Sequence, residues 1–569
     1  MAGAKSGSSS FAKHLATGRW TSVFASFLIM AGAGGSYLFP VFSSDIKKNL
    51  GYNQSALNTL SSFKDIGSTV GILSGLIAEV TPTWFVLLTG SVTNFFGYFM
   101  IWLAVTGRIP QPPLWQMCLY IFLGANSQNF ANTGALVTCV KNFPESRSIM
   151  LGLLKGYVGL SAAILNQLYL AIYGDDSSSL ILFIAWLPAV ISILVMYVIR
   201  EKEVKISQPN EVNVFYKFLY VSAALAVFLM SMTLVQQRVT FSPTGYDLSA
   251  TAACILVFLP SVVAFRQELL LWRKITTAPA EIVVENAQAG EQKQESSANE
   301  AEEPKMSFFA HICNKPKRGE DYSILQAVLS IDMLIIFIVT LVGLGSCLAA
   351  LDNLGQIGEA LLYEHKTVWT FASLGSIWSY AGRIFAGFAS EILLKKYKFP
   401  RPLMLSAILF VECIGHLLVA FPFYGSIYLS SLIVGFTSGA QLPLVFAIIS
   451  EIFGLKHFST LFNCGVMALP IGSFLLNKEL TGRLYDKEAK RQSTVINGLN
   501  QPLGQALVCK GQQCFGLSFT IMALATLFGA LISLILVGRT WSFYVNEVSR
   551  GGETYEKFSD EEKEEETRY

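Results

Sequence analysis

The chain alternates between long apolar runs and short polar stretches along most of its length. A helix needs about 20 mostly apolar residues to cross roughly 30 Å of hydrocarbon, and about fourteen runs satisfy that length. The pattern therefore predicts an all-α membrane protein. The predicted spanning helices cover residues 20–42, 56–78, 84–106, 114–140, 149–173, 179–199, 214–236, 248–265, 324–351, 368–392, 403–421, 426–453, 458–480 and 515–537.

The composition of the chain also points to the bilayer. Of 569 residues, 52% are hydrophobic and 14% are charged, and the mean hydropathy is +0.49. A soluble domain does not bury that much apolar surface, so the lipid bilayer is the expected partner. The formal net charge is only +2, which speaks against a nucleic-acid partner because nucleic-acid binders are strongly basic.

One sequence motif occurs twice. The first copy, GILSGLIAE, contains Gly75, and the second, GRIFAGFASE, contains Gly387. Such a repeat is typical of secondary transporters that arose by duplication of a helical bundle and bind substrate between the copies. Segments 214–236 and 248–265 have no counterpart in the repeat. We therefore expect two pseudo-symmetric six-helix bundles with an extra helix pair between them.

Basic residues gather on one side of the predicted bundle. Arg147, Arg200 and Lys395 all fall there, and the positive-inside rule assigns that side to the cytosol. An even number of helices puts both termini on the same side. The expected organisation is a cytosolic N-terminus (1–19), a first six-helix bundle (20–200), the extra pair (213–266), a cytosolic disordered linker rich in Glu, Gln, Ala and Ser (267–322), a second six-helix bundle (323–540) and an acidic cytosolic tail (541–569).

The chain carries no signature of an enzyme or a metal centre. It contains no Walker A sequence, no G-x-S-x-G, no H-E-x-x-H and no Cys/His cluster at metal-binding spacing. We therefore expect no catalytic residue, no metal and no cofactor. Cys509 and Cys514 fall in the last non-cytosolic loop. If that face is oxidising, they could close a short disulfide.

Several long stretches carry a family resemblance. A similarity to the nodulin-like proteins of plants is carried by RWTSVFASFLIMAGAGGSYLFPVFSSDIK, GILSGLIAEVTPTWFVL and FLGANSQNFANTGALVTCVKNFPESRSIMLGLLKGYVGLSAAI. The second half, in LGSCLAALDNLGQIGEALLY and SIWSYAGRIFAGFASEIL, resembles the nuclear-fusion-defective-like branch of the major facilitator superfamily. The match runs from residue 18 to about 545. It implies a major facilitator fold that works by alternating access.

The second half also resembles a motif of carboxylate carriers. In oxalate–formate and monocarboxylate carriers the superfamily's eighth helix reads R-x-x-x-G-x-x-x-D, and its Arg holds a substrate carboxylate. Arg383, Gly387 and Glu391 fit this spacing, with Glu in place of Asp. The carrier lysine of the superfamily's helix 11 has no clear counterpart, because Lys478 sits near the outer end of its segment. The resemblance implies carboxylate recognition by Arg383.

The repeated motif falls at a loop to which the superfamily gives a gating role. That loop normally reads G-x-L-x-D-R, whereas this chain has GLIAEVTPTW, with Glu79 for Asp and without the Arg. By analogy with the superfamily, four residues are expected to brace helices in one conformational state and release them in the other. They are Gly75, Glu79, Gly387 and Glu391.

Two basic residues lie deep inside predicted helices. Lys155 lies eight residues beyond Arg147 and Arg383 eight residues before Glu391, which puts each about 12 Å from the cytosolic end. A charge in mid-bilayer costs roughly 2.5–3.5 kcal/mol. One cation from each half could together bind an anionic substrate, with Arg383 binding a carboxylate through two hydrogen bonds. Alternatively, Arg383 is tied to Glu391, Asp332 or a helix C-terminus as a gate.

Other charged residues in these helices are candidates for binding solute or protons. Lys64 is a substrate candidate and its neighbour Asp65 a proton candidate, although both could instead fix packing against other helices. Glu412 and His416 are four residues apart and share a helix face. They could relay a proton at ordinary pH or form a structural pair. Asp332, near the start of its helix, is a further proton candidate.

The fourth predicted helix carries several amides within ANSQNFANTGAL. The four-residue step from Gln128 to Asn132 puts these two side chains on one stripe. Buried amides require hydrogen-bond partners. They either line the cavity and bind substrate, or hold helices together as polar residues do throughout membrane bundles.

These features favour a secondary active transporter of a small organic anion, a carboxylate, coupled to protons or to exchange and acting as a monomer. A neutral solute such as a sugar is an alternative, because the amides of the fourth helix suit hydroxyl groups. The alternative from another class is a non-transporting sensor or scaffold of the same fold, in which the linker and the extra helix pair bind partners.

Overall fold

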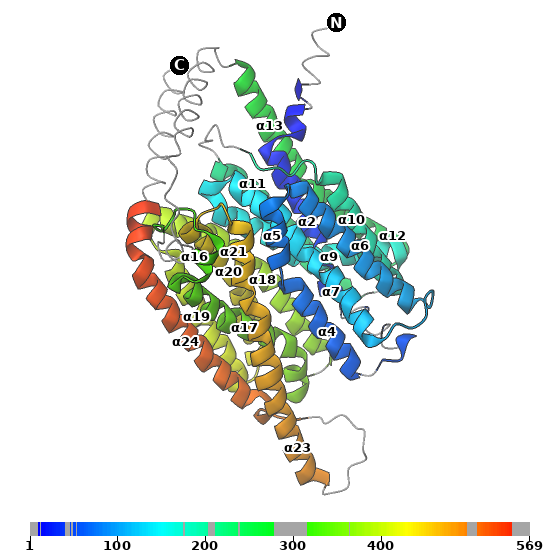
Figure 1. Cartoon of the computed structure of the whole chain (residues 1–569). Coiled ribbons are helices and arrows are strands. Elements are labelled where there is room, and N and C mark those ends of the chain that lie inside the picture. Colours follow the sequence, from blue (N-terminus) through cyan, green and yellow to red (C-terminus); the bar gives the residue numbers. More distant parts are fainter. Residues whose placement is uncertain are drawn as a thin grey trace.

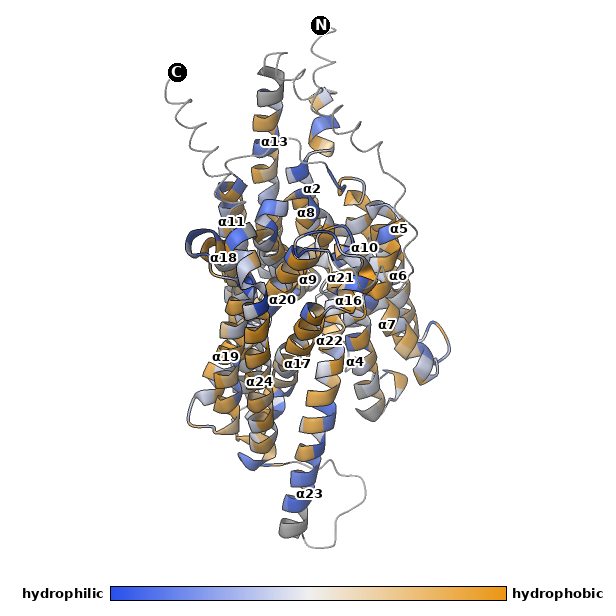
Figure 2. Cartoon of the chain, turned by 60° about the vertical axis from the view of Figure 1, so that its left-hand side comes forward, coloured by the Kyte–Doolittle hydropathy of each residue, from blue (hydrophilic) through white to orange (hydrophobic). Residues whose placement is uncertain are grey.

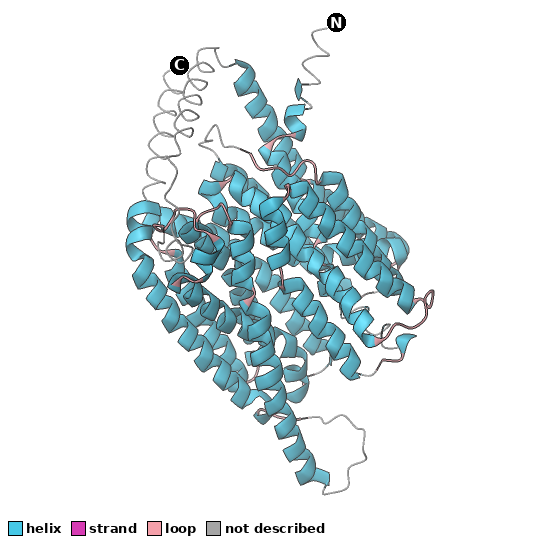
Figure 3. Cartoon of the chain, in the orientation of Figure 1, coloured by secondary structure: helices cyan, strands magenta, loops and turns pink. Residues whose placement is uncertain are grey.

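The computed structural model consists of helices joined by loops (Figure 3). It describes residues 10–548 apart from 12, 40–41, 43–45, 47–48, 53, 175–176, 203–210, 237–238, 240, 278–315, 364 and 498–508. Within these ranges every regular element is helical. Most of the predicted linker and most of the predicted tail lie outside the described residues.

The first half contains the first six predicted spans, two of which are interrupted. In chain order its helices are α2 (Arg19–Gly32) with η1 (Gly35–Leu38), α4 (Gln54–Thr69) with α5 (Ile72–Val80), α6 (Thr83–Val105), α7 (Leu114–Ala131) with η2 (Asn132–Leu136) and α8 (Val137–Asn142), α9 (Arg147–Tyr173) after η3 (Pro144–Ser146), and α10 (Ser177–Val195).

The second half repeats this plan after the extra pair. The pair consists of α11 (Glu211–Gln236) and α12 (Pro243–Phe258), which α13 (Pro260–Thr277) extends. The second half follows as α16 (Ile324–Val328), α17 (Ile331–Ala360), α18 (His365–Tyr397), α19 (Arg401–Ala420), α20 (Ser426–Phe453), α21 (Phe458–Val466) with α22 (Ala468–Ser473), η4 (Phe474–Gly482) and α23 (Arg483–Asn497), and α24 (Gln513–Phe543) with η5 (Tyr544–Val548).

The two halves lie side by side (Figure 1). Helix α2 begins and α24 ends at one end of the bundle, which we call the terminal end. Helix α23 projects from the opposite end, which we call the far end. Figure 2 shows the bundle helices as largely hydrophobic, whereas α23 is largely hydrophilic. The helix that contains the predicted span 458–480 continues to Asn497, because good helix formers such as Lys, Glu and Ala follow the apolar run.

Eleven of the described helices are long and apolar enough to cross a membrane. The predicted segments 56–78, 114–140 and 368–392 are helical but are not among these eleven. The first is divided into α4 and α5, of 16 and 9 residues, and the other two carry more polar side chains, such as Asn126 and Arg383. A total of fourteen spanning helices stays a prediction.

The break between α4 and α5 is stabilised by amides of α7. Asn126 Nδ2 donates to the backbone oxygens of Gly67, at 2.9 Å, and Val70, at 2.7 Å. Asn129 Nδ2 also donates to Gly67 O, at 2.9 Å. These carbonyls lack helical partners where the helix is interrupted, and an unpaired carbonyl inside a membrane is costly. Two of the four amides of this helix therefore hold helices together.

The extra pair touches both halves through α11. Gln236 of α11 and Gln167 of α9 exchange amide hydrogen bonds of 2.9 and 3.0 Å. On the other side, Tyr380 of α18 donates its hydroxyl hydrogen to Ser222 Oγ of α11 at 3.0 Å. A helix inserted between the halves in sequence thus also lies against both of them in space.

Candidate functional site

Arg383 of α18 contacts Lys155 of α9 inside the bundle. Arg383 Nη1 donates to the backbone oxygen of Lys155 at 2.7 Å. Both residues are buried, 8% and 7% exposed respectively. The guanidinium lies against bare backbone at Gly159, where a Cβ would come within 2.6 Å of Nη1. The structure thus brings together the two deep cations of the two halves.

The ammonium group of Lys155 has two contacts. Its Nζ donates to Asn132 Oδ1 at 3.0 Å and lies 5.0 Å from the centre of the Phe446 ring, a cation–π arrangement. Asn132 begins η2, a π-helical turn, and such turns occur frequently at functional sites. Sequence reasoning missed Phe446, because an aromatic residue in an apolar helix is indistinguishable from core.

These two cations have no carboxylate partner among the described residues, and Arg383 Nε is buried without a hydrogen-bond partner. Glu391, one alternative partner of Arg383, is instead held by Arg401 at 2.6 Å and Lys395 at 3.2 Å. The contact of Arg383 with Glu391 that would define a gate is therefore not formed in this structure.

Asp332, the other alternative partner of Arg383, lies elsewhere. It accepts from Arg318 Nε at 2.9 Å and from Arg539 Nε at 2.6 Å. Two guanidinium groups thus bind the carboxylate of Asp332. This environment suits an anchor between α17 and α24 better than a proton carrier.

The two amides of the predicted stripe, Gln128 at the end of α7 and Asn132 at the start of η2, have different environments. Gln128 Oε1 accepts from Ser36 Oγ at 3.0 Å, whereas Asn132 supports Lys155. Both amide side chains are buried. Asn132 is therefore the amide of this stripe that lies beside the basic pair.

Glycines of the repeated motif lie where the halves meet at the terminal end. A Cβ on Gly75 would stand 2.8 Å from the backbone oxygen of Ser459 in α21. A Cβ on Gly387 would stand 2.9 Å from the Cα of Gly152 in α9. Helices of opposite halves approach this closely only without side chains between them.

Glu79 also bridges the halves at this end. Its carboxylate lies 2.8 Å from His457 Nδ1 and accepts from Ser459 Oγ at 2.5 Å and Thr460 Oγ1 at 3.2 Å. The three partners surround the start of α21, where a negative charge interacts favourably with the helix dipole. Glu391 differs, because its ion pairs remain within the second half. Sequence reasoning missed His457, which follows an unremarkable GLK stretch.

The remaining substrate and proton candidates lie in separate places. Lys64 Nζ pairs with its neighbour Asp65 at 2.8 Å and lies 5.4 Å from the centre of the Phe39 ring. Asp352 of α17 accepts from Asn477 Nδ2 at 3.1 Å. It also lies within electrostatic range of Lys64 and Asp65. Glu412 and His416 form a pair buried within the second half.

The structure joins Cys509 and Cys514 by a disulfide of 2.05 Å at the far end. Six other cysteines in the described residues are free and lie buried or partly buried. Among the described residues, no group of three or more His, Cys, Asp or Glu side chains could hold a metal ion.

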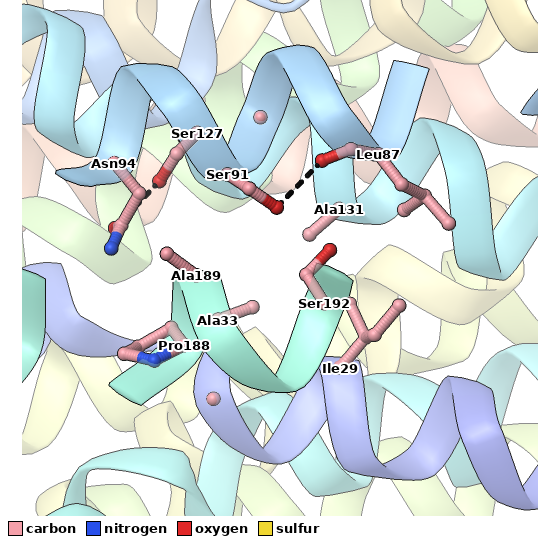
Figure 4. Close-up of a pocket in the computed structure, with 12 residues that line it drawn as sticks. Ile29, Ala33, Leu87, Ser91, Asn94, Ser127, Ala131, Pro188, Ala189 and Ser192 are labelled. Atoms are coloured by element: carbon pink, nitrogen blue, oxygen red, sulfur yellow. Dashed lines mark hydrogen bonds between the residues drawn. The ribbon is translucent and has the colours of Figure 1, made fainter. Parts of the chain in front are cut away.

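A small pocket lies within the first half, between α2, α6, α7 and α10 (Figure 4). It is lined by neither basic residue of the pair. On its wall, Asn94 Nδ2 donates to the backbone oxygens of Ile184, at 2.9 Å, and Ala185, at 3.0 Å. Pro188 has no N–H, so the Ile184 carbonyl lacks a donor from its own helix. Asn94 therefore supplies the hydrogen bond to the Ile184 carbonyl that Pro188 cannot donate.

Solved structures of similar architecture belong to the major facilitator superfamily. The proton:xylose symporter XylE bound to 6-bromo-6-deoxy-D-glucose gives a TM-score of 0.53 at 12% identity, covering 94% of this chain and 96% of that chain. A double-tryptophan XylE mutant gives 0.55 at 13% identity, covering 94% and 98%. The FucP transporter in its outward conformation gives 0.50 at 13%, covering 91% and 99%. The predicted all-helical membrane protein with the major facilitator fold is confirmed.

Two family models together span most of the chain. Residues 19–265 match the Nodulin-like family and residues 320–546 match the NFD4 C-terminal domain. Protein NUCLEAR FUSION DEFECTIVE 4 of Arabidopsis thaliana is 24% identical over 543 residues, 92% of this chain and 89% of that protein. The probable transporter MCH1 of Yarrowia lipolytica is 27% identical over 188 residues, 32% of this chain and 36% of that protein. The chain therefore belongs to the nodulin-like, NFD4-type family and has the major facilitator fold.

Proposed function

We propose that this protein is a secondary transporter that moves a small organic anion, of the carboxylate class, by alternating access between its two halves. The observation that carries the proposal is the contact of Arg383 with Lys155. They are two buried cations, one from each half, with no carboxylate partner among the described residues. Buried charges are normally paired, and a bound anion would supply the missing charge.

The contacts of the pair suggest how the anion is held. Arg383 uses one Nη1 hydrogen on the backbone of α9, which leaves Nε and Nη2 for the two oxygens of a carboxylate. Lys155, oriented by Asn132, adds a second positive charge. Because the two cations belong to different halves, an anion that touches both stabilises the conformations in which the halves meet there.

The gate at the terminal end is part of the same proposal. Glu79 at the start of α21 and the contact of Gly387 with Gly152 hold the halves together there. Release of these contacts would open this end of the anion site. We propose that the terminal end is cytosolic and both termini lie there, because Arg147, Arg200 and other basic residues gather at this end.

A sugar is the second candidate solute. Its support is the fold shared with XylE, whose structure holds a sugar analogue. Two facts favour the anion for this chain. The side-chain oxygens of Gln128 and Asn132 already accept from Ser36 and Lys155, and Arg383 Nε, which is buried without a partner, belongs to a cation.

A thermal-unfolding screen of the detergent-purified protein tests the proposal. A ligand at about 100 times its Kd adds about 2.7 kcal/mol to the folded state. We expect stabilisation by carboxylates such as oxalate or lactate, and not by xylose. The Arg383→Gln variant should lose the stabilisation by carboxylates. The Arg200→Gln variant, changed at an exposed position, should keep it. Stabilisation by xylose that Arg383→Gln retains would overturn the anion assignment, and no response to any solute would favour the sensor or scaffold alternative.

A further inference from the structure

A second buried cluster of titratable groups lies inside the second half, apart from the proposed anion site. Glu412 and His416 of α19 are both 0% exposed, and Glu412 Oε1 lies 3.2 Å from His416 Nε2. Ser346 Oγ of α17 is 2.6 Å from the same carboxyl oxygen. Gln441 Nε2 of α20 donates to the other oxygen, Oε2, at 2.7 Å. Three helices thus enclose the carboxyl group.

The charge of this cluster is incomplete without a proton. Among the described residues no Lys or Arg pairs with Glu412, and its ion-pair partner is His416. The other imidazole nitrogen, His416 Nδ1, is buried without a partner. An ionised Glu412 beside a neutral imidazole would be an uncompensated charge in apolar surroundings, which is costly. One added proton, on either group, makes the pair neutral overall.

We propose that Glu412 and His416 form a proton-binding site whose occupancy biases the equilibrium between the conformational states of the two halves. The titratable groups that face Glu412 from neighbouring positions are the thiols Cys347 of α17 and Cys413 of α19. From α20 and α24 the groups in contact with the cluster are Gln441 and Thr526, which do not titrate. Glu412 and His416 lie within hydrogen-bonding distance of each other, so the proton is assigned to this pair.

Helix α20 connects this site to the proposed anion site. Gln441 binds Glu412 on one side of Pro443, and Phe446 lies against the ammonium of Lys155 on the other. When the proton leaves, the hydrogen bonds from Ser346 and Gln441 remain but do not neutralise the carboxylate, and water could hydrate it if α20 moved away. That motion carries Phe446 with it and exposes Lys155. This link to solute rests on the proposed transport function, whereas proton binding does not.

An infrared titration without any solute tests the proton site. The full-length protein is compared between about pH 5 and about pH 8, the range in which His titrates. We expect a pH-dependent band from the buried pair that is lost in Glu412→Gln and altered in His416→Gln. Glu359→Gln, at an exposed carboxyl of α17, should retain it. A pH difference spectrum that is the same in the wild type and in folded Glu412→Gln would overturn the proposal.

A spin-label distance measurement tests the conformational bias. Labels at Val80 and Lys456, both exposed, report on the separation of the halves at the terminal end, in a background without the free cysteines. We expect the distance distribution to shift between about pH 5 and about pH 8, and the shift to vanish in Glu412→Gln but not in Glu359→Gln. A shift that survives in Glu412→Gln, or no shift in the parent protein, would overturn the bias. Because no solute is added, failure of the anion screen leaves both results valid.

Discussion

Gly387 of α18 and Gly152 of α9 lie so close that a Cβ on Gly387 would stand 2.9 Å from the Cα of Gly152. The two helices belong to opposite halves, and their backbones meet at the terminal end. About one turn away on each helix, Ser148 of α9 and Ser390 of α18 are hydrogen-bonded at 2.7 Å. The closed terminal end therefore depends on the absence of side chains at these glycines.

A methyl group at this contact should open the terminal end. We expect Gly387→Ala to lengthen the distance between spin labels at Val80 and Lys456, because neither backbone can yield without separating the halves. The matched control is Gly538→Ala in α24, where a Cβ would meet nothing within 4 Å. An unchanged distance in Gly387→Ala would show that α18 and α9 can part locally while the halves stay together.

Neutralising Glu79 should weaken the same closure by a different route. Glu79→Gln removes the negative charge at the start of α21 and its interaction with His457. The two side chains are partly exposed, at 16% and 26%, so we expect a coupling energy of about 1 kcal/mol. A double-mutant cycle with His457→Ala, read from the same label populations, measures it. Strictly additive effects would contradict direct coupling.

Removal of the Asn94 amide should destabilise the first half. Asn94→Leu leaves the carbonyls of Ile184 and Ala185 without their donor, at a cost of about 1–3 kcal/mol. Pro188→Ala restores an N–H that can reach the Ile184 carbonyl from within α10. The unfolding free energy of the double variant in detergent should therefore fall by less than that of Asn94→Leu alone. An equal loss in both backgrounds would rule out this role of Asn94.

Reduction of the disulfide between Cys509 and Cys514 should have a small, local effect. The two residues are five positions apart, and closure of so short a loop contributes about 2 kcal/mol in the chain-entropy model. Thermal unfolding with and without reductant measures this. We expect the Cys509→Ser/Cys514→Ser variant to resemble the reduced protein and to be unaffected by reductant. A larger loss on reduction would indicate that the bond also orders α23.

Much of the fold could be predicted from the order of residues. An apolar run of about 20 residues has few stable structures in lipid other than a spanning helix, because every backbone polar group must be satisfied within the segment. The repeated motif around Gly75 and Gly387 indicates two related halves, and its family resemblance predicts the facilitator fold. Basic residues deep inside apolar segments, such as Lys155 and Arg383, can also be recognised in the sequence, because a charge in the bilayer is costly.

The pairing of these residues was decided by the tertiary structure. Glu79 binds His457 of the other half, and Glu391 is occupied by Arg401 and so unavailable to Arg383. Such contacts depend on the rotation of each helix about its axis and on packing at the scale of an ångström, which hydrophobic periodicity does not encode. The sequence by itself therefore determined which apolar segments form the long helices and that Lys155 and Arg383 fall well inside two of them. Helix packing alone decided that Arg383 and Lys155 meet without a carboxylate partner among the described residues.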